Sequence, residues 1–267
     1  MTRLGVIGWP VAHSRSPAMH NAALAQLGMR EWRYQLLPVP PERFEETTRA
    51  LPGAGFLGVN VTIPHKRAAL ALASSASEAA AQIGAANMLS FGEDGEIAAE
   101  NTDAPGLLDA LGVEVAGMRA LVLGAGGSAR AAAWALREAG AGAVAVWNRT
   151  PERAEQLARE LGVSAAPRPL PADLLVNCTA VGLIPSASRD GELNQLALTF
   201  DALSEYSHVV DLAYSTSETA LLAAARAHGV HAVDGLEVLL AQGARSFELW
   251  TGRQAPIEVM RRAARGG

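Results

Sequence analysis

The chain has 267 residues, of which 49% are hydrophobic and 18% charged, so it can bury the cores of two domains. Its formal net charge of −5 argues against nucleic acid or an anionic membrane as main partner, because both require a basic surface. The single Cys178 excludes an internal disulfide, and none of the six histidines pairs with Cys or carboxylates at metal-ligand spacing, so we expect no metal. The N-terminal residues have no long apolar segment, and no alanine-rich stretch reaches membrane-spanning length, so we expect a cytoplasmic protein.

Strands and helices alternate along the first hundred residues. Apolar runs predict strands at 4–8, 32–39, 56–63, 87–91 and 97–100, the last two forming a hairpin around a turn at 93–95. Helical patterns cover residues 17–27, 41–51, 67–74 and 77–83. We interpret residues 1–101 as one α/β domain.

A second alternation follows from a predicted boundary near residue 102. Strands are predicted at 120–123, 143–147, 174–178, 209–212 and 230–233, with helices at 105–111, 128–139, 152–161, 218–228 and 235–250. Repeated strand–helix units of this kind form parallel sheets with right-handed crossovers. Residues 102–237 therefore form a second predicted domain, in which residues 170–203 are the least regular part.

A glycine-rich segment at 124–129 follows one of these strands and opens a helix. Its pattern is the G-x-G-x-x-A variant of the dinucleotide-binding fingerprint, in which the backbone and the helix N-terminus receive a pyrophosphate. The candidate cofactor residues are Gly124, Ala125, Gly126, Gly127, Ser128 and Ala129.

The residues at the end of the next predicted strand distinguish a site for NAD from a site for NADP. A site for NAD usually has an acidic residue there, which accepts hydrogen bonds from the ribose 2′-hydroxyl, but this chain has Asn148, Arg149 and Thr150. The guanidinium of Arg149 can pair with a 2′-phosphate, and Arg153 could reach the same group. This position predicts NADP as the cofactor. Thr150 also precedes Pro151 as an expected helix N-cap.

Polar residues recur through the first predicted domain. Ser14 and Ser16 are two residues apart before Pro17, so we expect an extended Ser16 with both hydroxyls on one side, although Ser16 is also placed as a helix N-cap. Asn60 and Thr62 face one side of a predicted strand. With Asn87 and Asp103, these groups predict a pocket for a small polyhydroxylated acid.

Lys66 is the only lysine in the chain, beside 21 arginines. Compositional bias could explain its rarity, but an amine can lose and regain a proton where an arginine cannot. Lys66 follows the strand that carries Asn60 and Thr62, and Asp103 lies at the predicted domain junction. We therefore interpret Lys66 as a candidate for proton transfer.

Several of these motifs together resemble the shikimate dehydrogenase family, including shikimate/quinate dehydrogenases. They are Ser14-Arg15-Ser16-Pro17, Asn60 to Lys66, Gly84 to Asn87, Asn101-Thr102-Asp103, Gly124 to Arg130, Asn148-Arg149-Thr150, Asn177-Cys178-Thr179 and Gln242. The resemblance implies an N-terminal α/β substrate-binding domain, an NADP-binding Rossmann domain, and a C-terminal helical segment (238–267) that returns to the first domain. The implied reaction is reversible NADPH-linked reduction of 3-dehydroshikimate to shikimate, a step of aromatic amino acid biosynthesis.

The resemblance also implies roles for individual residues. Lys66 and Asp103 match the catalytic pair, and Thr179 and Gly235 match the cofactor side. The residues that match substrate contacts are Ser14, Ser16, Thr62, Asn87 and Gln242, with Tyr214 lining the site and Asn60 as a further candidate.

Several positions depart from the family pattern: Met88 replaces a common Thr, Leu183 and Val238 replace common Met residues, and the proline usual shortly after the tyrosine is replaced around Ser215-Thr216. We expect these departures to lie mostly on the nicotinamide side. Two alternatives remain open: a quinate/shikimate dehydrogenase with broader substrate choice, and a catalytically silent NADP-binding sensor. The expected assembly is a monomer or a homodimer.

Overall fold

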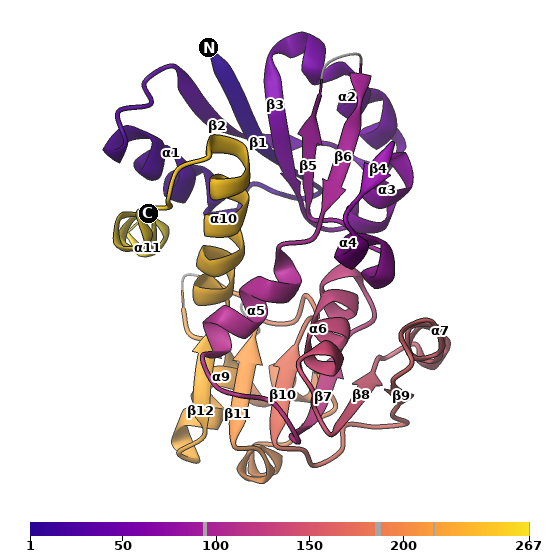
Figure 1. Ribbon diagram of the computed structural model, residues 1–267. Helices are drawn as coiled ribbons and strands as arrows, with labels where there is room; N and C mark the ends of the chain where they lie inside the picture. Colours follow the sequence, from indigo (N-terminus) through magenta and orange to yellow (C-terminus); the bar gives the residue numbers. More distant parts are fainter. Residues whose placement is uncertain (93–94, 185–187, 216, 267) are drawn as a thin grey trace. The chain divides into compact units, whose positions relative to one another are not determined.

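The computed structural model describes residues 1–92, 95–184, 188–215 and 217–266, and the chain falls into two compact units (Figure 1). The first unit comprises Met1–Gly106 and Leu239–Gly267, and the second comprises Leu107–Val238. The chain passes between units inside two helices, α5 (Asp103–Leu111) and α10 (Gly235–Thr251). The domain limits predicted at residues 101/102 and 237/238 fall near these passages and stay a prediction.

The first unit contains a mixed six-stranded sheet in the order β2-β1-β3-β5-β6-β4. The strands β1, β2 and β3 are parallel, whereas β5 is antiparallel to both β3 and β6. The predicted hairpin of β5 and β6 is confirmed by their pairing, although residues 93 and 94 of its predicted turn lie outside the described residues. The strands are β1 (Thr2–Gly8), β2 (Trp32–Pro38), β3 (Phe56–Val61), β4 (Ser75–Ala76), β5 (Met88–Phe91) and β6 (Ile97–Glu100).

The helices of this unit follow the predicted order with local differences. They are α1 (Ser16–Gln26), η1 (Pro41–Arg43), α2 (Phe44–Ala50), η2 (Pro52–Ala54), α3 (Lys66–Leu72), α4 (Glu78–Ile83), α10 and α11 (Ile257–Arg265). The predicted helix 41–51 is thus a 3₁₀ turn followed by an α-helix. The strand predicted to reach Ile63 ends at Val61, because the His65 N–H donates to the Thr62 carbonyl at 2.9 Å and closes a turn there.

The two C-terminal helices pack against α1. Buried side chains of α1, α10 and α11 form one hydrophobic cluster that includes Met19, Leu24, Phe247 and Met260. These contacts confirm that the C-terminal helical segment returns to the first domain, and they bring Gln242 of α10 to the site described below.

The second unit is built on a six-stranded parallel sheet in the order β12-β11-β10-β7-β8-β9. The chain places β8 and β9 on one side of β7 and then β10 to β12 on the other, which is the strand order of a doubly wound Rossmann sheet. The strands are β7 (Arg119–Leu123), β8 (Ala143–Trp147), β9 (Ser164–Ala165), β10 (Leu174–Asn177), β11 (His208–Asp211) and β12 (His231–Asp234).

Helices cover both faces of this sheet. Ala120 and Val122 of β7 join one hydrophobic cluster and Leu121 and Leu123 the other, so this central strand is apolar on both sides. The helices are α6 (Gly127–Glu138), α7 (Pro151–Leu161), α8 (Arg189–Gln195), η4 (Asp201–Glu205) and α9 (Ala220–Ala227). The sequence did not predict α8. Ser188 caps the N-terminus of this helix, because its hydroxyl accepts the Gly191 N–H.

None of the helices within the described part of the chain combines the length and apolar composition required to cross a membrane.

The close approach of α5 and α10 depends on Gly106. A Cβ atom at this position would lie 2.7 Å from both the Cβ and the backbone nitrogen of Gln242. Because real side chains do not approach so closely, any larger residue would separate the helix that carries Asp103 from the helix that carries Gln242.

We expect Gly106→Ala to destabilise the protein, although alanine normally stabilises the interior of a helix by about 1 kcal/mol relative to glycine. The clash with Gln242 should reverse that sign and cost about 1–3 kcal/mol, measurable as a lower urea midpoint. The control is Gly53→Ala, where no heavy atom lies within 4 Å of the new Cβ and the midpoint should barely move. An unchanged or raised midpoint for Gly106→Ala would contradict the packing argument.

Candidate active site

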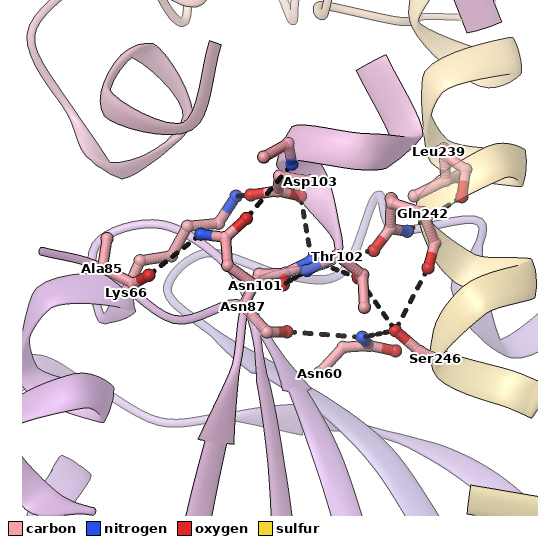
Figure 2. Close-up of polar contacts among 11 residues, drawn as sticks. Asn60, Lys66, Ala85, Asn87, Asn101, Thr102, Asp103, Leu239, Gln242 and Ser246 are labelled. Carbon is pink, nitrogen blue, oxygen red and sulfur yellow. Dashed lines mark hydrogen bonds and ion pairs between the residues drawn. The ribbon is translucent and has the colours of Figure 1, made fainter. Parts of the chain in front are cut away.

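Lys66 and Asp103 form a partly buried ion pair at the carboxyl ends of the first sheet. Lys66 begins α3, Asp103 begins α5, and 2.5 Å separate Nζ of Lys66 from Oδ2 of Asp103 (Figure 2). Their side chains are only 10% and 15% exposed. Charges removed from water to this extent require a close partner, and each supplies one to the other. The pairing of the two predicted catalytic residues gives one site both an amine and a carboxylate.

Asn87 holds the other oxygen of the Asp103 carboxylate. Its Nδ2 lies 2.9 Å from Oδ1 of Asp103, 2.9 Å from Oγ1 of Thr102 and 3.1 Å from Oε1 of Gln242. Its Oδ1 accepts the Thr102 N–H at 2.6 Å. Asn87 therefore joins β5 to the start of α5 and to α10, and it fixes the carboxylate relative to both (Figure 2).

The start of α5 is anchored by Asn101. Its Nδ2 donates to the Ala85 carbonyl at 2.9 Å, and its Oδ1 accepts the Ala104 N–H at 3.1 Å. An asparagine oxygen that accepts a backbone N–H three residues later is the usual helix cap. The Ala86 N–H in turn donates to the Lys66 carbonyl, so one loop holds the backbones of both catalytic candidates.

Gln242 belongs to the hydrogen-bonded group around Asn87, whereas the hydroxyl of Ser14 bonds at the start of α1. Gln242 donates from Nε2 to the Leu239 carbonyl at 2.8 Å and accepts from Asn87. Among the described residues, no hydrogen bond joins Ser14, Ser16 or Thr62 to the group around Lys66. The prediction that these side chains bind the substrate stays a prediction.

Two expectations for Ser16 are wrong: the residue is helical, not extended, and it is not the N-cap of the helix. Ser16 is the first residue of α1, and Arg15 occupies the N-cap position. The hydroxyl that meets the backbone at this helix start is that of Ser14, which accepts the Ser16 N–H at 3.3 Å. The turn before the helix, closed by the Ser14 N–H that donates to the Val11 carbonyl at 3.0 Å, sets the position from which the Ser14 hydroxyl meets the helix start.

Asn60 is 5% exposed and has internal partners for both of its amide atoms. Its Oδ1 accepts from the Tyr34 hydroxyl at 2.7 Å, and its Nδ2 lies 2.9 Å from Oγ of Ser246. Sequence reasoning missed both partners, because Tyr34 reads as one more apolar strand residue and Ser246 as one polar residue in a long helix. The bonds that Asn60 makes are within the protein, and its predicted contact with substrate stays untested.

The glycine-rich turn of the second unit has a geometry suited to a pyrophosphate. Gly124 has φ of +110°, a conformation that favours glycine, and a Cβ there would make a tight contact of 3.2 Å with the Cys178 carbonyl oxygen. Gly126 precedes α6, and open space surrounds the position of its missing Cβ. No side chain caps this helix start, and Ala129 is fully buried against the sheet. The N–H groups of the first turn of α6 can therefore meet an anion.

The end of β8 presents two cations beside this turn. Arg149 and Arg153 are both exposed, the first in the loop after β8 and the second in the first turn of α7. Asn148 donates to the Thr150 carbonyl at 2.9 Å and shapes the loop. Thr150 occupies the predicted N-cap position before Pro151, but its side chain makes no capping hydrogen bond.

A buried carboxylate lies at the ends of β10 and β11. Asp211 accepts from Asn177 Nδ2 at 2.8 Å and from the Thr219 hydroxyl at 2.7 Å. Burial raises the pKa of Asp211 to about 6, although these donors oppose the rise. Thr179 donates to Asn177 Oδ1 at 2.8 Å, so this network shapes the loop after β10 that carries a predicted cofactor residue.

The remaining predicted residues, Tyr214 and Gly235, follow the last two strands of the second unit. Tyr214 follows β11 and is half-buried. Gly235 begins α10 after β12, where a Cβ would lie only 2.5 Å from the Leu212 carbonyl oxygen.

Two of the positions that depart from the family pattern are buried: Met88 packs in a hydrophobic cluster of the first unit and Val238 in one of the second. Within the described residues, no group of three or more His, Cys, Asp or Glu side chains is placed to hold a metal ion.

The fold and these residues define a class of protein. A doubly wound unit with a pyrophosphate-type turn and a second unit with a paired amine and carboxylate are typical of two-domain nicotinamide-nucleotide dehydrogenases.

Comparison with known proteins gives the family. Three family models match: the shikimate dehydrogenase substrate binding domain over residues 6–89, shikimate / quinate 5-dehydrogenase over 108–181, and the shikimate 5'-dehydrogenase C-terminal domain over 235–265. A shikimate dehydrogenase (NADP(+)) of Methylobacterium radiotolerans is 46% identical, covering 94% of this chain and 91% of the relative. Its counterpart in Methanopyrus kandleri is 43% identical, covering 97% and 93%.

Solved structures that resemble this chain belong to the same family. Shikimate 5-dehydrogenase from Thermus thermophilus, crystallised in complex with NADP(H) and shikimate, is 44% identical with a TM-score of 0.88, covering 100% of this chain and 99% of that one. Shikimate dehydrogenase from Mycobacterium tuberculosis is 31% identical with a TM-score of 0.80, covering 100% and 99%. The chain belongs to the shikimate dehydrogenase family, which confirms the resemblance found in its motifs.

Proposed function

We propose that this protein catalyses the reversible NADPH-linked reduction of 3-dehydroshikimate to shikimate. The observation that carries the proposal is the Lys66–Asp103 pair held by Asn87, in a chain whose relatives are named as NADP-dependent shikimate dehydrogenases. A titratable amine held beside a fixed carboxylate is an arrangement that can transfer a proton to a ketone oxygen.

The residues of the second unit suit NADP. The pyrophosphate would lie against the segment 124–129, where the uncapped start of α6 offers N–H groups. A 2′-phosphate would pair with the exposed Arg149 and Arg153, and Asn148, Thr150, Thr179 and Gly235 would line the remainder of the nucleotide site. When bound, the nicotinamide supplies or accepts the hydride.

Lys66 would donate a proton to the substrate oxygen during reduction and, in its neutral form, remove that proton during oxidation. As negative charge develops on this oxygen, the nearby ammonium would also stabilise it electrostatically. Asp103 would orient the amine through Oδ2 and accept a hydrogen bond from a ring hydroxyl. In this proposal, Ser14, Ser16, Thr62, Asn87, Tyr214 and Gln242 hold the hydroxyls and the carboxylate of the substrate.

Two features favour this function over its alternatives. The three residues directly after β8 are Asn148, Arg149 and Thr150, and an arginine in place of an acid at this strand end argues against an NAD-linked quinate dehydrogenase. The intact pairing of Lys66 with Asp103 argues against a silent NADP-binding sensor. A cytoplasmic location and a monomeric or homodimeric state stay predictions.

Activity measurements with two substrates and two nucleotides test the proposal directly. Shikimate or quinate is mixed with NADP or NAD, and the absorbance of the reduced nicotinamide is followed. We expect the largest kcat/KM for shikimate with NADP. Equal values with quinate would favour the broader enzyme, and nucleotide binding with no turnover in any combination would favour the sensor.

We expect Lys66→Arg to keep the KM for shikimate within about threefold and to lose most of kcat. The guanidinium preserves the charge but does not release a proton near neutral pH, so the loss should be specific to the transition state. Steady-state kinetics measure both parameters. Arg67→Lys, an exchange at the exposed next position of α3, is the matched control and should retain wild-type turnover; near-normal kcat in Lys66→Arg would remove proton transfer from Lys66.

We expect Arg149→Ala to raise the KM for NADPH about tenfold or more while leaving the KM for NADH nearly unchanged. A charge-assisted pair with a 2′-phosphate contributes about 1.5–3 kcal/mol, and NADH has no such group. The preference for NADPH over NADH should narrow accordingly. Arg159→Ala, an exposed arginine on the same helix α7, is the control; an unchanged preference in Arg149→Ala would place the 2′-phosphate elsewhere.

A further inference from the structure

A chain of buried hydrogen bonds extends from the Lys66–Asp103 pair into the interior of the first unit. It passes from Asn87 to Thr102, from Thr102 to Ser246 on α10, from Ser246 to Asn60, and from Asn60 to Tyr34 (Figure 2 shows all of these residues except Tyr34). Ser246 is fully buried and Tyr34 is 1% exposed, so neither side chain is open to solvent. Neither residue belongs to the catalytic, substrate or cofactor groups proposed above.

The orientation of the Asn60 amide is determined by its surroundings. One end of the amide lies 3.3 Å from the Asn87 carbonyl, which only accepts hydrogen bonds, so Nδ2 must be at that end. Oδ1 then faces the Tyr34 hydroxyl, which donates to it at 2.7 Å. A reversed amide would place its oxygen against the carbonyl oxygen of Asn87, so this carbonyl selects the orientation, and the Tyr34 hydroxyl satisfies the Oδ1 that results.

The hydroxyl of Ser246 has the same property. It lies 2.9 Å from Asn60 Nδ2, 3.1 Å from Thr102 Oγ1 and 3.1 Å from the Gln242 carbonyl. Since the carbonyl can only accept, the single proton of Ser246 goes to it, and Ser246 accepts from both other partners. Thr102 therefore donates to Ser246, and the three partners use the full hydrogen-bonding capacity of one hydroxyl.

This direction is transmitted to the catalytic pair. Because the Thr102 proton is directed at Ser246, its oxygen is free to accept from Nδ2 of Asn87. The same Nδ2 donates to Asp103 Oδ1, and Asp103 holds the amine of Lys66 with its other oxygen. Each bond in the chain thus has one permitted donor, ending at the carboxylate that orients Lys66.

Tyr34 is itself held rigidly. Its backbone N–H and carbonyl both bond to the side chain of Asn21 at 2.9 Å. Its ring stacks on that of His20, with centroids 4.2 Å apart and planes 2° from parallel. Burial lowers the pKa of His20 to about 3, so this stacking partner stays neutral at physiological pH.

We infer that Ser246 and Tyr34 are positioning residues for the reaction, acting through Asn60, Thr102 and Asn87 to fix the Asp103 carboxylate and the Lys66 amine. The inference rests on the proposed function for the meaning of that position, since Lys66 is the proposed proton donor. Without the Ser246 hydroxyl, Thr102 loses its acceptor and its proton turns toward Asn87, which releases one bond to the amide that holds Asp103.

Two variants of Ser246 separate positioning from simple structural support. We expect Ser246→Ala to lower kcat about 10- to 100-fold with the KM for NADP within about twofold, and with little change in Tm. Ser246→Thr keeps the hydroxyl but adds a methyl group at a fully buried site, so Tm should fall while kcat stays within about threefold of wild type. Thr251 already makes the same bond to a carbonyl four residues earlier on α10. If kcat follows Tm across the two variants, the positioning role is overturned.

Tyr34→Phe removes the terminal donor without adding atoms. We expect a lower kcat at an unchanged KM for NADP, and a less than additive loss when it is combined with Ser246→Ala, because both act through Asn60. Tyr206→Phe is the matched control: Tyr206 is a buried tyrosine of the second unit whose hydroxyl donates to the Leu170 carbonyl. It should keep wild-type kcat. Equal kcat in the two single tyrosine variants would overturn the role of Tyr34.

A measurement that requires no turnover tests the chain of bonds separately. Lys66 is the only lysine, so protein labelled with ¹⁵N-lysine gives one side-chain signal that reports on Nζ directly. We expect this signal to be displaced in Ser246→Ala and Tyr34→Phe, and to be unchanged in Tyr206→Phe. Suppose that the wild-type protein does not oxidise shikimate, but the Lys66 signal is still displaced in Ser246→Ala and Tyr34→Phe. This result would refute the proposed function but not the chain of bonds. An unmoved Lys66 signal in both network variants would refute the chain itself.

Discussion

The candidate site of the first unit depends on the contact between Lys66 and Asp103. Both groups are largely removed from water, so each is stable as an ion only while the other remains beside it. Neither residue lies in the rigid middle of a strand, because each begins a helix just after a strand ends. The protein therefore has to hold two helix starts at a fixed separation, and much of the surrounding structure can be understood as meeting this requirement.

Three side chains provide that fixation. Asn87, just before β5, bonds the Asp103 side chain, Asn101 caps α5, and Gln242 arrives on α10 from the C-terminal part of the chain. Gly106 permits the last of these, because only a residue without a side chain allows α5 and α10 to touch at this point. Close packing and hydrogen bonding thus act together. A side chain at position 106 would separate the two helices and lengthen the hydrogen bonds that join Asn87 to Gln242 and Thr102 to Ser246.

The sequence predicts the second unit better than the interior of the first, for a physical reason. A parallel sheet buried on both faces has continuous apolar strands and a glycine-rich turn, and these are local signals that appear around Leu121 and Gly124. The polar chain around Lys66 depends on contacts such as Asn60 to Ser246, which span 186 positions and leave no periodic trace. The serine start of α1 was mispredicted for a related reason, since which of two nearby hydroxyls meets the backbone depends on the path of a loop. α8 was missed because its cap, Ser188, lies in a stretch rich in Pro, Ser and Asp, which otherwise indicates irregular structure.

The difference between Lys66 and the 21 arginines follows from this arrangement. An arginine at position 66 would present a planar fork that suits two parallel bonds to a carboxylate, whereas Asp103 offers Lys66 one oxygen and gives the other to Asn87. The network therefore divides the carboxylate between a titratable amine and a neutral amide. Because every bond leading to that amide has a single permitted direction, the amide keeps its N–H groups toward Oδ1 of Asp103 and leaves Oδ2 to Lys66. A proton donor held in this way needs little reorganisation when charge develops on a substrate oxygen, which is the condition under which electrostatic stabilisation is most effective.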